Sequence, residues 1–220
     1  GVGSVSVHGS IPTQGPVLII SNHPGVFDSI AMLSTATRED LYFTALNTYS
    51  IFGPKISRQL LPIYRKRKIN HFLYEYPLSL QLKVPFQHTP PKEDIQKRNR
   101  ETITRAAELI NTSHAVSIFP TGSAGKQLKD SKWKPGVGYL VKQINNPSTN
   151  VIFGHIKGTK QTDVFAYMQP VIKKLFFKAQ PILITFSEPH KLTKMINNNL
   201  EPKQIALELE KKYEQWLINS

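Results

Sequence analysis

The chain has 220 residues, 40% of them hydrophobic and 20% charged, which is enough for one globular domain with a sizeable core. The absence of cysteine excludes disulfides, thiolate zinc sites and a cysteine nucleophile. A net charge of +13 favours an anionic partner, which can be nucleic acid, an acidic membrane surface or a phosphorylated substrate.

The first half of the chain is predicted to alternate between strands and helices. A strand at 5–8 is followed by a turn and by a strand at 17–21, whose unbroken apolar run is typical of a strand buried on both faces. Helical periodicity follows over 28–37. Two more strands are expected at 41–46 and 60–64.

The second half continues the alternation after an aromatic and proline-rich stretch, 69–91, that the pattern leaves unassigned. Helices are predicted at 93–111, 136–144 and 202–217, and strands at 115–119, 151–156 and 182–186. We therefore expect an α/β fold in which helices flank a mainly parallel central sheet, with residues 1–220 forming one domain. No run of about 18 apolar residues is present, so no transmembrane helix is predicted.

His23 and Asp28 stand where such a fold places catalytic groups. His23 follows the buried strand at 17–21, and ligands of open α/β sheets bind outside the carboxyl ends of the strands. Asp28 lies near the start of the next helix, from which its carboxylate can orient one imidazole nitrogen and leave the other free to take a proton. The alternative interpretation is that Asp28 is a helix N-cap and His23 an ordinary turn residue.

No serine nucleophile is evident. A Gly-x-Ser-x-Gly elbow is missing from the sequence, and Ser21 and Ser29 flank the His-Asp pair without forming such a motif. If the enzyme supplies no nucleophile, His23 would deprotonate a substrate hydroxyl directly.

Two further segments carry glycine or positive charge after buried strands. The loop from Pro120 holds Gly122, Ser123, Gly125 and Lys126, but its glycine spacing does not fit a nucleotide P-loop. Its alternative interpretation is an ordinary strand-to-helix connection. Arg65 opens a basic run at 65–68, which can hold a phosphate or can be solvated surface.

Taken in order, these segments resemble the glycerolipid acyltransferase family, of the lysophosphatidic acid acyltransferase type. The family's Asn-His-x4-Asp block matches residues 22–28, and an apolar or aromatic residue shortly before an arginine matches 61–65. The third block, Phe-Pro-Glu-Gly-Thr-Arg, is partly matched at 119–124, and 133–138 is similar to the segment that opens the family's next helix. The likeness extends over residues 5–189.

The resemblance implies roles for individual residues. His23 would be the general base oriented by Asp28, while the acceptor and its phosphate would be bound by Asn22, Arg65, Thr121, Gly122, Ser123 and Lys126. The family's glutamate is Thr121 here and its arginine is Ala124. The family associates these two positions with acceptor binding, so the resemblance leaves the acceptor headgroup open. Lys126 is expected to replace the lost charge.

The implied reaction moves a fatty acyl group from acyl-CoA or acyl-carrier protein to a hydroxyl of a lysophospholipid or glycerol phosphate, with no metal or other cofactor. The basic charge then suits an anionic membrane surface, on the cytoplasmic side, reached peripherally or through an N-terminal anchor upstream of Gly1. Nucleic acid is disfavoured as a partner, because aromatic residues are interleaved with basic ones only near residues 64–83. The alternatives are an acyltransferase for another lipid acceptor and a non-catalytic lipid- or nucleic-acid-binding module.

Overall fold

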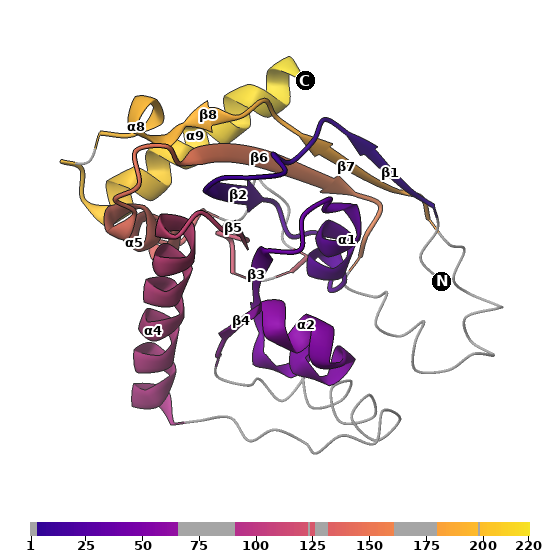
Figure 1. Cartoon of the computed structure of the whole chain (residues 1–220), viewed down its shortest axis with the longest axis horizontal. Helices are drawn as coiled ribbons and strands as arrows, with labels where there is room; N and C mark the ends of the chain where they lie inside the picture. The colour runs from indigo at the N-terminus through magenta and orange to yellow at the C-terminus, as the bar shows by residue number, and fades with distance from the viewer. Residues whose placement is uncertain (1–3, 66–90, 123, 126–131, 161–179, 198) are drawn as a thin grey trace.

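A computed structural model describes residues 4–65, 91–122, 124–125, 132–160, 180–197 and 199–220. The strands in this part of the chain are β1 (Val5–His8), β2 (Val17–Ser21), β3 (Leu41–Leu46), β4 (Leu60–Ile63), β5 (Ala115–Ile118), β6 (Asn150–Lys157), β7 (Ile182–Phe186) and β8 (His190–Lys191). They form one sheet in the order β1-β7-β6-β2-β5-β3-β4, with β8 beside β6 (Figure 1). Only β6 pairs antiparallel among the described strands, with β7 and with β8. The predicted α/β class with a mainly parallel sheet is confirmed.

The helices flank this sheet. They are α1 (Asp28–Thr35), the 3-10 helix η1 (Asn47–Phe52), α2 (Pro54–Gln59), α4 (Lys92–Asn111), α5 (Gly136–Gln143), α8 (Leu192–Met195) and α9 (Pro202–Asn219). Each predicted helix and strand in the described residues is present, with ends that differ by two residues or fewer. Sequence patterns missed η1, α2, α8 and β8, because elements this short show no full period of apolar residues.

The core lies on both sides of β2, as its unbroken apolar run predicted. Leu18 and Ile20 point to the layer formed by α4, α5 and α9, while Val17 and Ile19 point to the opposite layer, which contains α1 (Figure 1). This alternation follows from the two-residue period of a strand. β2 is therefore held rigidly, and so is the point where it ends.

Parallel pairing brings the carboxyl ends of five strands to one edge. β2 pairs with β5 and β6, and β3 joins β5 to β4, all in parallel. The residues that follow these strands, including His23 and Arg65, therefore meet at the same edge of the sheet. The candidate site is assembled from segments that are far apart in sequence.

The described helices do not include one that is both long enough and apolar enough to cross a bilayer.

Candidate active site

His23 and Asp28 form a hydrogen-bonded pair at the carboxyl edge. The distance from His23 Nδ1 to Asp28 Oδ2 is 2.7 Å. The Asp28 side chain is fully buried, whereas that of His23 keeps 17% of its surface exposed. A buried carboxylate fixes the ring orientation and the tautomer of its histidine, and it stabilises the ring when it gains a proton.

The carboxylate of Asp28 is held by two further donors. Gly25 donates its backbone N–H to Oδ2 at 2.8 Å, and the hydroxyl of Thr159 donates to Oδ1 at 2.5 Å. Asp28 is the first residue of α1, and its side chain makes no capping bond to that helix. The N-cap interpretation is therefore wrong: the carboxylate points back into the loop, where it orients His23.

Gly25 is required by the close approach of the chain after β6. A Cβ atom at Gly25 would lie 2.6 Å from Cβ of Thr159 and 2.7 Å from the amide nitrogen of Lys160. The approach is made possible by Gly158, whose φ of 95° lets the chain turn sharply as β6 ends. These two glycines bring Thr159 to Asp28.

The ring and the backbone of His23 are each held by a residue of the loop that follows β5. It stacks on Phe119 with ring centroids 4.6 Å apart and an interplanar angle of 23°. The backbone N–H of Gly125 donates to the carbonyl of His23 at 2.9 Å. Nε2 of His23 has no hydrogen-bond partner in the part of the chain described here, so it is available to a substrate proton.

Asn22 has a different contact from the one predicted. Its side-chain amide donates to the carbonyl of Ile156 at 2.9 Å and accepts from the backbone N–H of Ile156 at 2.7 Å. Both amide atoms are thus engaged with β6, which anchors the residue directly before His23. These contacts support a positioning role, and a direct contact between Asn22 and substrate stays a prediction.

The third block forms a tight turn next to His23. Gly122 has a φ of 66°, and its N–H donates to the carbonyl of Phe119 at 3.0 Å. That amide is therefore already used within the turn, while Thr121 beside it is buried. The binding roles of Thr121 and Gly122 stay predictions.

A lysine outside the predicted set covers this turn. A Cβ atom at Gly122 would lie 2.8 Å from Nζ of Lys134, and the backbone N–H of Lys134 donates to the carbonyl of Pro120 at 3.0 Å. The preceding residue, Trp133, donates its N–H to Oε1 of Glu210 at 3.1 Å. The glycine at 122, two residues before the Ala124 that replaces the arginine of the family pattern, thus leaves room for the ammonium group of Lys134.

Arg65 and Asp28 both act on Tyr49 of η1. Burial raises the pKa of the Tyr49 hydroxyl above its ordinary value, the negative charge of Asp28 raises this pKa further, and the positive charge of Arg65 lowers it. The effect of a charge on such a group weakens with the distance between them. The structure therefore brings the first and second blocks into one electrostatic environment.

Other predicted residues lie outside the described part of the chain. These are Ser123 and Lys126 of the third block, the basic residues 66–68 and almost all of the aromatic stretch 69–91.

Ser21 and Ser29 do not form a nucleophile with His23. Both hydroxyls are buried, and neither has a hydrogen-bond partner within the described chain. In the same residues, no three His, Asp or Glu side chains gather as metal ligands.

Sequence reasoning missed Thr159, Lys134 and Tyr49. Thr159 is 131 residues from Asp28, so no local spacing could connect the two. Lys134 belongs to the segment 133–138, which resembles the family only as the start of a helix and so gave no role to its lysine. A signal existed only for Tyr49, which stands in an aromatic segment between the first two blocks.

A protein-family model described as Acyltransferase matches residues 4–171. Among solved structures, the chain is similar to PlsC, the 1-acyl-sn-glycerophosphate (LPA) acyltransferase from Thermotoga maritima, at 15% identity and a TM-score of 0.49, over 95% of this chain and 70% of that one. No protein with a curated description matches the sequence. Because the family model extends over well more than half of the chain and includes all three blocks, the chain belongs to the Acyltransferase family.

Proposed function

We propose that the protein transfers a fatty acyl group from an acyl thioester, acyl-CoA or acyl-carrier protein, to a hydroxyl of a glycerophosphate or lysophospholipid. One observation carries this proposal. Nδ1 of His23 lies 2.7 Å from the carboxylate of the fully buried Asp28, to which it donates when Nε2 is the base, and Nε2 has no partner in the described chain. This arrangement suits a general base that acts on a substrate hydroxyl rather than on a serine.

The chemistry needs only these groups and the two substrates. Nε2 of His23 takes the proton of the acceptor hydroxyl as its oxygen attacks the thioester carbonyl carbon. The tetrahedral intermediate collapses, the carbon–sulfur bond breaks, and the thiolate leaves. The proton then passes from the imidazolium to the thiolate, so that an ester and a free thiol are the products. Asp28 stabilises the imidazolium between these two proton transfers.

The charges at the same edge support an anionic acceptor. Lys134 places its ammonium group against Gly122, and Arg65 is close enough to influence Tyr49 together with Asp28. A phosphate near the attacking hydroxyl would be neutralised by such cations. In this proposal Lys134, rather than Lys126, compensates for Ala124 in the third block.

The first test is thiol release from palmitoyl-CoA with lysophosphatidic acid, comparing the intact protein with His23→Ala. We expect acceptor-dependent release that falls by about 10²- to 10⁴-fold in the variant. His190→Ala is the matched control, because His190 is exposed on β8. Equal activity in His23→Ala would exclude His23 as the base. An intact protein without activity towards any thioester or lysolipid would favour the non-catalytic binding module.

A second acceptor class is favoured by the altered third block. Thr121 and Ala124 replace the glutamate and arginine of the family pattern, so a lipid acceptor without a glycerophosphate group is the alternative. Replacing lysophosphatidic acid by neutral and amine-bearing lipids in the same assay separates the two. Preference for a phosphate-free acceptor would overturn the glycerophosphate assignment and keep the reaction.

The proposal includes binding to an anionic membrane surface, where such lipids reside. The net charge of +13 supports it, since each well-placed cation contributes about 1 kcal/mol near anionic lipid. Sedimentation with vesicles of phosphatidylcholine and phosphatidylserine should retain the protein at low salt and release it at high salt. A protein that remains in the supernatant at low salt would contradict this part.

A further inference from the structure

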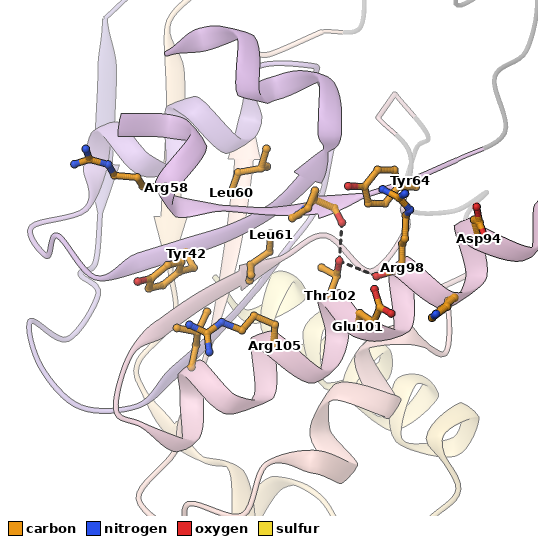
Figure 2. Close-up of a pocket in the computed structure, with 13 residues that line it drawn as sticks. Tyr42, Arg58, Leu60, Leu61, Tyr64, Asp94, Arg98, Glu101, Thr102 and Arg105 are labelled. Atoms are coloured by element: carbon orange, nitrogen blue, oxygen red, sulfur yellow. Dashed lines mark hydrogen bonds between the residues drawn. The ribbon is translucent and has the colours of Figure 1, made fainter. Parts of the chain in front are cut away.

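A groove outside the His23 site runs between the edge strand β4 and helix α4. Its volume is about 640 Å³, within the range of small-molecule sites (Figure 2). One wall is formed by β4 and by Tyr42 of β3, the other by the face of α4 from Asp94 to Leu109, and Arg58 of α2 also lines it. Of the three family blocks, only the second, residues 61–65, contributes to the lining of this groove.

The walls of the groove are fixed by hydrogen bonds between α4 and β4. The Asn99 side chain accepts from the N–H of Tyr64 at 2.8 Å and donates to the carbonyl of Tyr64 at 2.9 Å. The hydroxyl of Thr102 donates to the carbonyl of Pro62 at 2.7 Å (Figure 2). The groove is therefore preformed and does not depend on side-chain packing alone.

The groove combines positive charge with flat aromatic and apolar surface. It is lined by four cationic residues (Arg58, Lys97, Arg98 and Arg105) and two carboxylates (Asp94 and Glu101). The guanidinium of Arg98 lies over the ring of Tyr64 at 5.2 Å, and Leu60, Leu61 and Leu109 also line the groove. Arg105 also makes an exposed ion pair with Glu108 at 3.1 Å, so part of its hydrogen-bonding capacity is already used. This chemistry suits a ligand with several phosphates attached to an aromatic ring system.

The position of the groove relates it to the catalytic edge. From Asp94 to Arg105 the helix extends about 16 Å along the strands. The end at Tyr64 lies where β4 ends, next to Arg65. Between β4 and β2 there are three strand intervals, or about 14 Å. A ligand in the groove can thus reach His23 only through a long flexible arm that crosses the carboxyl edge.

We propose that this groove binds the phosphorylated nucleotide of coenzyme A, from which the pantetheine arm carries the acyl thioester across the sheet edge to His23. This inference rests on the proposed acyl transfer function. It adds a separate binding site for the donor, and it selects a coenzyme A thioester over acyl-carrier protein as that donor. The cations bind the phosphates, and Tyr42, at the end of the groove away from the carboxyl edge, provides surface for the adenine ring. The acceptor is not held here.

Equilibrium binding tests the site without any turnover. Isothermal titration of the intact chain with coenzyme A and with adenosine 3′,5′-bisphosphate should give binding that weakens at least tenfold in the double variant Arg98→Gln/Arg105→Gln. Arg100→Gln is the matched control, since Arg100 is on the same helix but outside the groove, and it should change binding less than twofold. Circular dichroism checks that the variants fold alike.

Competition distinguishes the phosphate sources. Adenosine 3′,5′-bisphosphate should displace coenzyme A, whereas lysophosphatidic acid below its micellar concentration and inorganic phosphate should not. Displacement by lysophosphatidic acid, unchanged binding in the double variant, or no binding of coenzyme A to the intact protein would each overturn the proposal. Because no step requires acyl transfer, a failed transferase assay with intact groove binding would count against the proposed function alone. Where transfer is measurable, the double variant should raise KM for palmitoyl-CoA about tenfold and leave KM for the acceptor unchanged.

Discussion

Two short hydrogen-bonded pairs, His23–Asp28 and Arg38–Asp40, occupy opposite edges of the sheet and differ in which partner is exposed to solvent. At the carboxyl edge, the buried Asp28 holds a partly exposed His23 at 2.7 Å. At the amino edge, Arg38 is buried and holds Asp40 at 2.6 Å, with 38% of the Asp40 side chain exposed. The bond lengths are nearly equal, so length does not separate a reactive pair from a structural one.

The remaining hydrogen bonds separate them. Arg38 also donates to the carbonyls of Pro12, Gly15 and Ser113, which ties three loops together and leaves the guanidinium no role towards a ligand. At the other edge, the extra donors all converge on Asp28, and His23 keeps one ring nitrogen without a partner in the described chain. A buried cation whose donors all have partners stabilises the fold. A carboxylate held by several donors, next to a histidine with one available ring nitrogen, is suited to proton transfer.

Asp28→Asn should produce the largest effect and tests the reactive side of this contrast. An amide cannot stabilise the imidazolium and can hold His23 in the wrong tautomer, so kcat should fall by about 10²- to 10⁴-fold. Steady-state thiol release measures it, with folding verified by urea titration. Retention of more than a tenth of the activity would show that Asp28 does not support His23 in catalysis.

Asp40→Asn tests the structural side. It leaves the buried Arg38 without its anion, and we expect a loss of about 2 kcal/mol in the free energy of unfolding, reduced from the cost of breaking a fully buried pair because Asp40 is partly exposed. Activity of the folded variant should be unchanged.

The pH dependence of that loss has a defined sign. The hydrogen bond from Arg38 holds the pKa of Asp40 below its ordinary value of 3.8, against the opposing effect of burial. A lowered carboxylate pKa stabilises the folded chain above the unfolded pKa and ceases to do so as pH falls through the folded one. The difference between wild type and variant should therefore be constant above about pH 5 and shrink below pH 4. A difference as large at pH 3 as at pH 6 would contradict the ion-pair explanation.

Thr159 should have an intermediate effect. Thr159→Val keeps the shape of the side chain but removes the donor to Oδ1 of Asp28, and we expect kcat/KM to fall about tenfold, or about 1.4 kcal/mol. Thr159→Ser restores the hydroxyl and should recover activity to within about threefold. If serine is as impaired as valine, Thr159 acts through packing and not through its hydrogen bond.

Part of this arrangement could be predicted from the sequence, and the limits have physical causes. The apolar run of β2 placed His23 at the end of a buried strand, and the five-residue interval to Asp28 is closed within one loop. The bonds from Thr159 to Asp28 and from Asn22 to Ile156 depend on the parallel register of β2 with β6, which no local pattern encodes. Lys134 was missed for a similar reason, since only the folded turn shows that its ammonium group lies over Gly122. The groove requires α4 to lie against β4, and residue patterns predict each element without predicting how the two pack.

The smallest expected effect concerns His155, a half-buried histidine of β6 whose contacts, like those of Arg38, are structural. Its Nδ1 lies 3.0 Å from the hydroxyl of Tyr213, and burial, with a smaller effect from Lys157, lowers its pKa from 6.5 to about 4. Between these two pH values the unfolded chain binds a proton that the folded chain does not, so stability should fall as pH drops from 6.5 to 4 and be level above 6.5. Since the ring is only partly buried, solvent screening should reduce the total loss to about 1–2 kcal/mol. His155→Asn, which keeps a polar atom near Tyr213, should remove that slope in urea titrations between pH 4.5 and 7.5. If the free energies of unfolding of wild type and variant change with pH in parallel, the pH dependence arises elsewhere. If the two curves converge only below pH 6.5, His155 is a neutral structural histidine. His23 differs from it, because His23 must gain a proton to work.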